Sequence, residues 1–259
     1  FAKDNHISFT NLISCKTSYN YFLPNQIKLI TAPLEFNFNK SKIKKESIYL
    51  GPIINPKNIL LKINKYDRSF SHDYFKNICN EYDKIIYCSF GTTLYSPNEN
   101  IIKFYNVLLY IFKINSNLLL IITDNFRVKH KIFNKISNNI KILNFAPQST
   151  ILKYCDVMIS HGGLNSIIEC IFNKVPMIVY PLNSVTDMKG NAARVKYLGL
   201  GTYGDLRKES IDGIQKKLNL VLYQSIYKEN LKEIYQTIFN NDYYNKVNFK
   251  INEIIQGYV

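Results

Sequence analysis

The sequence lacks a Cys-x-x-Cys pair, a long uninterrupted hydrophobic run and a dense basic tract, and each absence excludes a class of protein. The five cysteines are an odd number, and no metal-ligand spacing links them to any of the four histidines. We therefore expect buried free thiols in a reducing compartment, not a disulfide framework or a metal centre. Tryptophan is also absent, which together with heavy use of Asn, Ile, Lys and Tyr indicates a biased genome composition.

The hydrophobic segments are too interrupted to cross a bilayer. The longest, VLLYIFKINSNLLLII, is broken by Lys113 and by Asn115–Asn117, so it does not suit a single transmembrane helix. The chain begins at Phe1, without a recognisable signal peptide, and we expect it to be a fragment of a longer protein. We expect that protein to be cytoplasmic, with a peripheral membrane contact left open.

The charge is strongly positive, with 33 Lys and Arg against 19 Asp and Glu, for a net charge of +14. Such a balance favours anionic partners, including nucleic acid, acidic lipid and phosphorylated ligands. The lysines are nevertheless spread along the chain, and no aromatic–basic repeat supports nucleic-acid binding. We interpret the charge as a solvated lysine-rich surface and expect no nucleic-acid partner.

Short apolar runs alternate with longer segments of helical spacing, a pattern that predicts an α/β fold. The runs end in Gly, Pro, Asp or Ser and are rich in Ile, Leu and Val, as expected of strands in a parallel sheet covered on both faces. They are IKLITAP, KIIYCSFG, NLLLIITD, NIKILNFAP, DVMIS and VPMIVYP. Helices are predicted at about residues 97–113, 163–172 and 187–197, and two or three more after about residue 205. The order predicts a doubly wound sheet, in which ligands bind beyond the carboxyl ends of the strands.

The segment SHGGLNSIIE (Ser160–Glu169) gathers polar groups where a strand would pass into a helix. On a helical projection that advances about 100° per residue from His161, three polar residues fall on one side of the helix axis: Asn165 near about 40°, Glu169 near about 80° and Ser166 near about 140°. The isoleucines fall on the opposite side. The helix N-terminus offers unpaired N–H groups, and two glycines permit close approach of a ligand. The segment predicts a phosphate site with a carboxylate suited to ribose hydroxyls. On these residues alone, a capped surface helix after a glycine turn remains the alternative.

Neighbouring strand ends carry similar chemistry. FAPQ (residues 145–148) offers an aromatic ring for stacking on a base and an amide for its sugar. SFGTT (residues 89–93) offers a glycine and two threonine hydroxyls after its strand, and YPLNSVTDMKGNAARV follows a strand that should lie beside the cluster. Together these ends predict a nucleotide site.

The run from FAPQ through SHGGLNSIIE to YLGLG resembles the donor-binding signature of UDP-sugar-dependent glycosyltransferases with the GT-B fold. These are the UDP-glucuronosyl/glucosyltransferases and their bacterial macrolide and carotenoid relatives. SFGT resembles the first loop of that donor domain, whereas LITAPLEFNF and YLGPI resemble the end of the N-terminal domain and the entry to the linker. The resemblance implies a Rossmann-like C-terminal domain of a GT-B enzyme, followed by C-terminal helices.

The resemblance also implies a domain layout. Residues 1–50 would be the end of a truncated N-terminal acceptor domain, and residues 51–82 an interdomain linker. Residues 83–240 would form the nucleotide-sugar donor-binding domain, and residues 241–259 a C-terminal helix returning toward the N-terminal domain. The rest of the N-terminal half would be missing from this chain.

The resemblance implies roles for named residues. Phe145 stands where an aromatic ring stacks on uracil, Gln148 where a glutamine contacts the nucleoside, and Glu169 where a carboxylate holds the ribose hydroxyls. Asp187 is the acidic member of an Asp/Glu–Gln pair that holds the sugar, although Met188 replaces the Gln here. The diphosphate-binding positions are His161, Gly163, Asn165 and Ser166, with Thr92 facing them.

The implied function is inverting transfer of a hexosyl group from a UDP-sugar to a hydroxyl of a small-molecule or lipid acceptor. The family's catalytic base is a His near the start of the N-terminal domain. No residue matches it, because His6 lies too late in the family order, so no catalytic residue is assigned. No Asp-x-Asp motif occurs, and we expect neither a metal nor a cofactor. The alternative is a non-catalytic nucleotide-sugar-binding module from a split or degraded gene.

Overall fold

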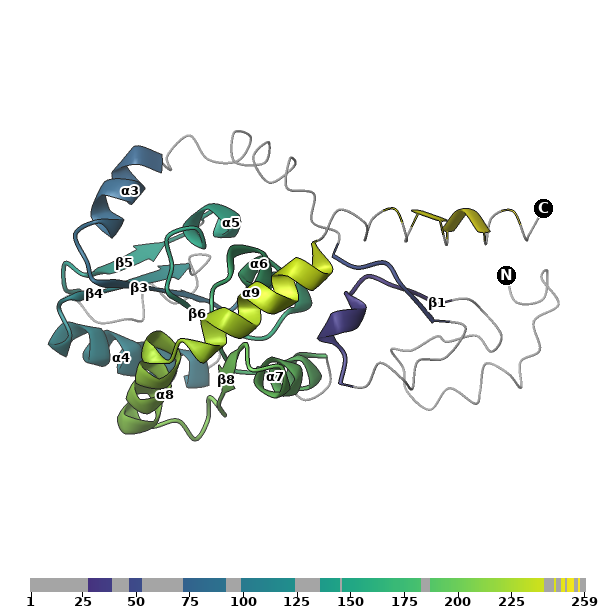
Figure 1. Ribbon diagram of the computed structural model, residues 1–259. Coiled ribbons are helices and arrows are strands. Elements are labelled where there is room, and N and C mark those ends of the chain that lie inside the picture. The colour runs from purple at the N-terminus through teal and green to yellow at the C-terminus, as the bar shows by residue number, and fades with distance from the viewer. Residues whose placement is uncertain are drawn as a thin grey trace, which may run out of the picture. The chain divides into compact units, whose positions relative to one another are not determined.

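The computed structural model describes residues 28–38, 47–52, 72–91, 99–123, 136–144, 146–182, 187–239, 245, 248–249, 251–253 and 256. The chain divides into two compact units. One comprises residues 1–53 with 245–259, and the other comprises residues 54–244. The larger unit contains the main sheet (Figure 1).

The smaller unit contains a short parallel pair of strands. Strand β1 (Lys28–Ile30) pairs with β2 (Ser47–Tyr49), and the 3-10 helix η1 (Leu34–Phe36) lies between them in the chain. Leu29 is 55% exposed. The predicted strand IKLITAP therefore exists, but it is not covered on both faces, because β1 belongs to a two-stranded sheet and not to the large one. Strand β2 was not predicted.

The larger unit is built on a six-stranded parallel sheet in the order β5-β4-β3-β6-β7-β8. The strands are β3 (Lys84–Ser89), β4 (Leu118–Thr123), β5 (Ile140–Leu143), β6 (Val157–Ser160), β7 (Met177–Val179) and β8 (Gly201–Tyr203). The chain builds outward from β3 to β5, then returns to the other side of β3 with β6. The order therefore reverses between β3 and β6, which confirms the predicted doubly wound sheet. Strand β8 was not predicted.

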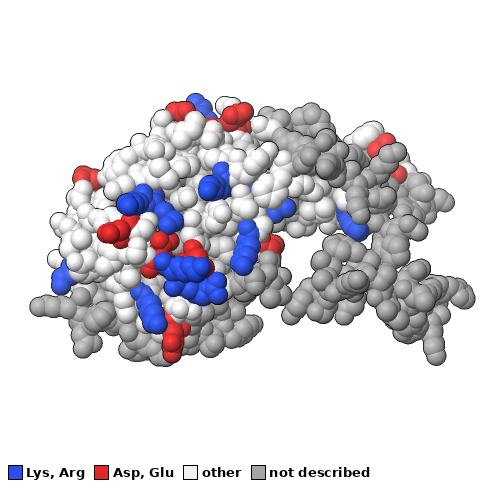
Figure 2. Space-filling view, turned by 90° about the horizontal axis from the view of Figure 1, so that it is seen from below, with Lys and Arg blue, Asp and Glu red and all other residues white. Residues whose placement is uncertain are grey.

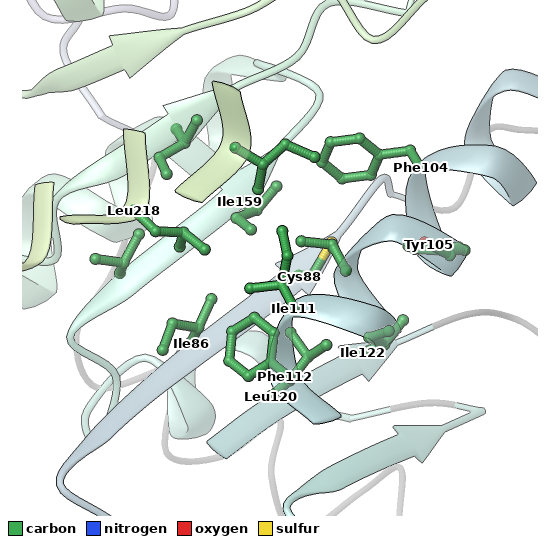
Figure 3. Close-up of a cluster of buried hydrophobic side chains, with 14 of the residues drawn as sticks. Ile86, Cys88, Phe104, Tyr105, Ile111, Phe112, Leu120, Ile122, Ile159 and Leu218 are labelled. Atoms are coloured by element: carbon green, nitrogen blue, oxygen red, sulfur yellow. The ribbon is translucent and has the colours of Figure 1, made fainter. Parts of the chain in front are cut away.

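Helices α4 (Glu99–Ile114) and α8 (Ile211–Tyr223) cover one face of this sheet (Figure 1). Their apolar side chains pack on alternate strand residues such as Ile86, Leu120 and Ile159 (Figure 3). Phe112 of α4 is fully buried there, at 0% exposure. Burying one such side chain stabilises the fold by about 1.5–3 kcal/mol. These contacts confirm the helix predicted near residues 97–113.

Helices α5 (Gln148–Ile151) and α6 (Leu164–Asn173) lie on the opposite face (Figure 1). The Cys170 thiol of α6 donates to Met158 Sδ of β6, with 3.2 Å between the sulfur atoms. Helix α9 (Ile226–Ile238) packs on α6, and the Phe172 ring contacts those of Tyr235 and Phe239. Helix α6 is thus held on the sheet at its centre and on α9 at its C-terminal end.

Helix α3 (His72–Cys79) falls in the segment expected to be an interdomain linker. Its buried Phe75 ring meets the Tyr154 ring edge-on, so this part of the segment is packed within the larger unit. Helix α7 (Met188–Tyr197) packs on β7 and β8. The domain boundaries themselves stay predictions.

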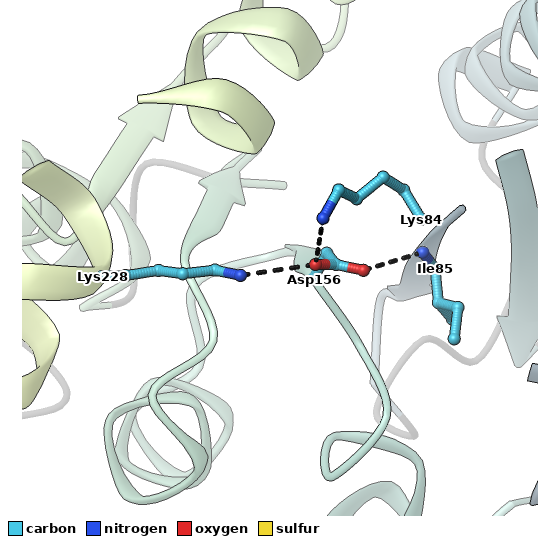
Figure 4. Close-up of polar contacts among 4 residues, drawn as sticks. All are labelled: Lys84, Ile85, Asp156 and Lys228. Atoms are coloured by element: carbon cyan, nitrogen blue, oxygen red, sulfur yellow. Dashed lines mark hydrogen bonds and ion pairs between the residues drawn. The ribbon is translucent and has the colours of Figure 1, made fainter. Parts of the chain in front are cut away.

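Asp156, which directly precedes β6, makes a hydrogen bond and two ion pairs at the amino-terminal edge of the sheet (Figure 4). Its Oδ1 pairs with Lys84 Nζ at 3.1 Å and with Lys228 Nζ of α9 at 3.3 Å. Its Oδ2 accepts from the Ile85 N–H at 3.1 Å. This network joins β3, β6 and α9 at the end of the sheet opposite to that where parallel strands bind ligands.

The surface carries both signs of charge. On the face seen in Figure 2, carboxylates lie among the Lys and Arg side chains, as expected for a solvated lysine-rich surface. Cys79 is a buried core residue, as expected for a free thiol in this chain, and burial raises the pKa of its thiol to about 11. Within the described residues, none of the helices combines the length and apolar character that a bilayer span requires.

Candidate functional site

The candidate site lies where the strand order reverses, at the carboxyl ends of β3 and β6. Ser89 and Ser160 are register partners, so the two strands end level with each other. In a doubly wound sheet this is the place where a ligand binds. Phe90 and Gly91 follow β3, and His161 directly follows β6.

His161 lies between the backbones of these two loops. A Cβ added to Gly91 would lie 2.8 Å from His161 Cε1, and one added to Gly163 would lie 2.6 Å from its Nε2. The side chain is buried, and its Nδ1 has no hydrogen-bond partner among the described residues. Burial lowers the pKa of His161, with the Asp187 carboxylate opposing the shift. His161 is therefore neutral near pH 7 and suits hydrogen bonding to a ligand better than charge pairing.

The turn from β6 into α6 depends on glycine. Gly162 has φ +87, and a Cβ there would lie 2.7 Å from Val179 Cγ1 and 3.2 Å from the Met188 carbonyl oxygen. Gly163 is the N-cap of α6 and has no side chain with which to cap the helix, and no hydrogen bond between a described side chain and the first-turn amides is seen. The amides of the first turn are thus left for an external acceptor, next to the positive end of the helix dipole. The predicted helix start is confirmed.

The predicted polar face of α6 exists and is joined to α5. Gln148 Nε2 donates to Glu169 Oε2 at 2.9 Å and to Ser166 Oγ at 3.2 Å. All three residues are half-buried, and Asn165 beside them is exposed. The structure therefore brings together three predicted site residues from two elements.

Asp187 is connected to the same turn by a residue that sequence reasoning missed. Asp187 is the exposed N-cap of α7. Asn191 Nδ2 donates to Asp187 Oδ2 at 2.8 Å and to the Gly162 carbonyl oxygen at 2.9 Å. The available signal was an amide four residues after Asp187, beside Ala192 and Val195 on the buried face of the helix.

Two predicted site residues, Thr92 and Phe145, lie outside the described residues. Met188, which replaces the expected glutamine, begins α7 and is half-buried. Its carbonyl oxygen lies close to Gly162, as noted above. The described site therefore comprises the α6 turn, the polar face of α6 and the start of α7.

A model of the family described as UDP-glucoronosyl and UDP-glucosyl transferase matches residues 74–240. Human UDP-glucuronosyltransferase 2B17 is 31% identical over 103 residues, which are 39% of this chain and 19% of that protein. NDP-glycosyltransferase YjiC of Bacillus subtilis (strain 168) is 24% identical over 201 residues, which are 77% of this chain and 46% of that protein. The chain thus spans less than half the length of these relatives.

Solved structures show the same fold. The glycotransferase of kitacinnamycin has a TM-score of 0.71 at 18% identity, over 87% of this chain and 54% of that one. UDP-glucose: anthocyanidin 3-O-glucosyltransferase in complex with UDP has a TM-score of 0.68 at 19% identity, over 88% of this chain and 53% of that one. These neighbours confirm the expected Rossmann-like α/β domain of the GT-B type. By the match over residues 74–240, the chain belongs to the UDP-glucoronosyl and UDP-glucosyl transferase family.

Proposed function

We propose that this chain binds the UDP-sugar donor of an inverting glycosyltransferase and supplies the donor half of that enzyme. The observation that carries the proposal is the Gln148–Ser166–Glu169 cluster beside the uncapped start of α6. UDP presents a diphosphate, which needs donors, and a ribose diol, which suits a carboxylate. The cluster offers both at the reversal point of the sheet.

The diphosphate would lie at the first turn of α6. Ser166 Oγ already accepts from Gln148, so its own proton is available for a phosphate oxygen. His161, which is buried beside the backbones of Gly91 and Gly163, is the proposed contact nearest to the turn itself. Asn165 and Gly163 complete the proposed set on α6, and Thr92 would face them from the loop after β3.

The ribose would lie one helical turn further along α6. Ser166 and Glu169 are three residues apart, which corresponds to about 4.5 Å along the helix axis. Glu169 Oε2 accepts from Gln148, which orients the carboxylate before a ligand arrives. Phe145 would stack on the uracil, and Asp187 would hold the sugar.

In the proposed reaction an acceptor hydroxyl oxygen attacks the anomeric carbon in line, and the bond from that carbon to the β-phosphate oxygen breaks. The hydroxyl proton passes to a general base, and UDP leaves with its charge stabilised at the start of α6. The chain spans about half of the solved glycosyltransferases that share its fold. We propose that the base and most of the acceptor pocket lie outside these 259 residues.

The proposed transfer moves a hexosyl group to a small or lipophilic acceptor without metal or cofactor. Met188 leaves the sugar specificity open, since a thioether does not pair with sugar hydroxyls as an amide does. A cytoplasmic location stays a prediction.

A transfer assay tests the proposal. The chain, alone and joined to the upstream sequence of its gene, would be given radiolabelled UDP-glucose and a phenolic acceptor, with and without EDTA. We expect transfer only by the longer protein and no effect of EDTA. Transfer by the chain alone would contradict the donor-half assignment. A longer protein that binds UDP but transfers none of a panel of UDP-sugars would support the non-catalytic alternative.

A further inference from the structure

We propose that Asn191 is a positioning residue that holds the phosphate turn and the sugar-binding carboxylate in a fixed relation. The inference rests on the proposed function. Its geometric basis is one side-chain amide group that bridges two separate parts of the site. Through Asn191, the diphosphate subsite on α6 and the sugar subsite on α7 would form as one unit.

The bridge uses the full donor capacity of the Asn191 amide. An asparagine NH₂ group has two protons, and Nδ2 has two acceptors, the Gly162 carbonyl oxygen at 2.9 Å and Asp187 Oδ2 at 2.8 Å. Asn191 is 5% exposed, so water competes little for these bonds. Its neighbours Ala192 and Val195 are also buried. Burying a side-chain amide costs free energy unless its hydrogen bonds are made, and the Asn191 amide makes both of its donor bonds here.

The first bond fixes the direction of an amide in the turn. The carbonyl of Gly162 and the N–H of Gly163 belong to one trans peptide and therefore point in opposite directions. With the Gly162 oxygen held toward α7, the Gly163 N–H points away from α7. Gly162 N–H is in turn held by Ser160 Oγ at 3.2 Å. A turn of two glycines, the most flexible residues, is thus fixed at both polar groups of Gly162.

The second bond fixes the Asp187 carboxylate. Asp187 is exposed, and an exposed Asp side chain would otherwise sample several rotamers. The Asn191 bond takes Oδ2, so in the proposed site Oδ1 is the oxygen that would accept from a ligand hydroxyl. A carboxylate that is already oriented binds without the entropy loss of being ordered. Asn191 therefore favours sugar binding without touching the sugar.

Asn230 provides a matched control within the same unit. Its Nδ2 donates to the Gly199 carbonyl oxygen at 3.0 Å, so it also links a helix to a glycine of a neighbouring loop. Asn230 lies on α9, and its partner Gly199 precedes β8, at the amino-terminal edge of the sheet opposite to the proposed site. Asn191→Ala and Asn230→Ala therefore each remove an asparagine-to-glycine bond, but only the first removes it from the proposed site.

The experiment is calorimetry of both variants with uridine, UDP and UDP-glucose, with thermal unfolding as a check on folding. For Asn191→Ala we expect unchanged uridine affinity and UDP affinity lowered about fivefold, as for loss of one hydrogen bond. UDP-glucose affinity should fall further than UDP affinity. Asn230→Ala should leave all three affinities unchanged. If Asn191→Ala does not fold, Asn191→Ser replaces it with the same expected changes, since its hydroxyl is polar but ends one bond short of the Nδ2 position.

A double-mutant cycle separates positioning from general stability. In an Asp187→Ala background, Asn191→Ala should still lower the affinity for UDP. It should no longer change the ratio of the affinity for UDP-glucose to the affinity for UDP. Equal losses for uridine, UDP and UDP-glucose, or losses equal to those of Asn230→Ala, would overturn the inference. A further drop in that ratio in the Asp187→Ala background would overturn the part that acts through Asp187. Wild-type chain that binds no UDP would instead overturn the proposed function, and this inference with it.

Discussion

Gln148 Nε2 lies 2.9 Å from Glu169 Oε2, so an amide from the start of α5 orients a carboxylate on α6. The two residues follow different strands, β5 and β6, which are not neighbours in the sheet. Their contact shows that the site is built by convergence of strand ends, as the doubly wound fold predicts. It also gives the proposed ribose site a fixed geometry before binding.

The ribose assignment predicts discrimination against 2′-deoxy-UDP. The wild-type chain should bind UDP more tightly than 2′-deoxy-UDP by about 1.5–3 kcal/mol, because a hydrogen bond to a charged carboxylate is lost. Glu169→Gln should remove most of this preference for UDP, since an amide oxygen accepts a hydrogen bond more weakly than a carboxylate oxygen does. Calorimetry with both nucleotides measures it. If Glu169→Gln keeps the full preference, Glu169 does not hold the ribose.

The phosphate assignment predicts a selective effect of Ser166→Ala. UDP binding should weaken by about 1.5–3 kcal/mol, roughly tenfold to a hundredfold, because a donor to a charged oxygen is removed. Uridine binding should change much less. The hydroxyl also accepts from Gln148, so Ser166→Cys serves as a control of similar size with a weaker donor. An equal loss for uridine and UDP would show that Ser166 does not face the phosphates.

The environment of His161 predicts a pH dependence of stability. Burial lowers the pKa of His161 in the folded chain, whereas the unfolded imidazole titrates near about 6.5. The unfolded chain therefore binds the proton more readily, and acid favours unfolding. This contribution to stability is present above about pH 6.5 and is lost as the pH falls below it.

His161→Gln, which does not titrate, isolates this effect. Between about pH 7.5 and about pH 5.5 the wild-type Tm should fall by more than the Tm of His161→Gln. The measurement is thermal unfolding without ligand at both pH values. An identical fall in the two proteins would mean that His161 titrates alike in the folded and unfolded chains.

The turn into α6 predicts that Gly162 does not tolerate a side chain. Gly162→Ala places a Cβ at φ +87, 2.7 Å from Val179 Cγ1, and the left-handed conformation alone costs about 1–2 kcal/mol. We expect a lower Tm and lost UDP binding. Gly190→Ala within α7 is the control and should stabilise by about 0.5–1 kcal/mol, since the close contact of the added Cβ among the described residues is the far end of the long Arg194 side chain, at 3.0 Å. Equal Tm values for the two variants would contradict the proposed role of the turn.

Several elements could be predicted from the sequence because their signal is local. The continuous apolar runs of β3 and β4 and the glycine-to-helix transition at α6 required no tertiary information. Strands β2 (SIY) and β8 (GTY) lack the runs of Ile, Leu and Val that mark the predicted strands, and β8 begins at a glycine whose backbone lies against Met177.

The site was predicted as a set of residues but not as a set of contacts. The helical projection placed Ser166 and Glu169 on one face because both lie on one helix. The Gln148 and Asn191 bonds join elements that are distant in sequence, and only the assembled sheet brings them together. Asn191 resembled an ordinary helix residue because its role depends on Gly162, 29 positions earlier.

The most direct test of the central claim is calorimetric titration of the folded wild-type chain with UDP, using uridine as the reference ligand. The proposed site predicts binding of UDP that is tighter than binding of uridine by at least about tenfold, because the diphosphate adds charge-assisted hydrogen bonds at the start of α6. A near-native thermal unfolding transition would establish that the sample is folded. Folded chain that binds neither ligand, or binds both with equal affinity, would contradict the account.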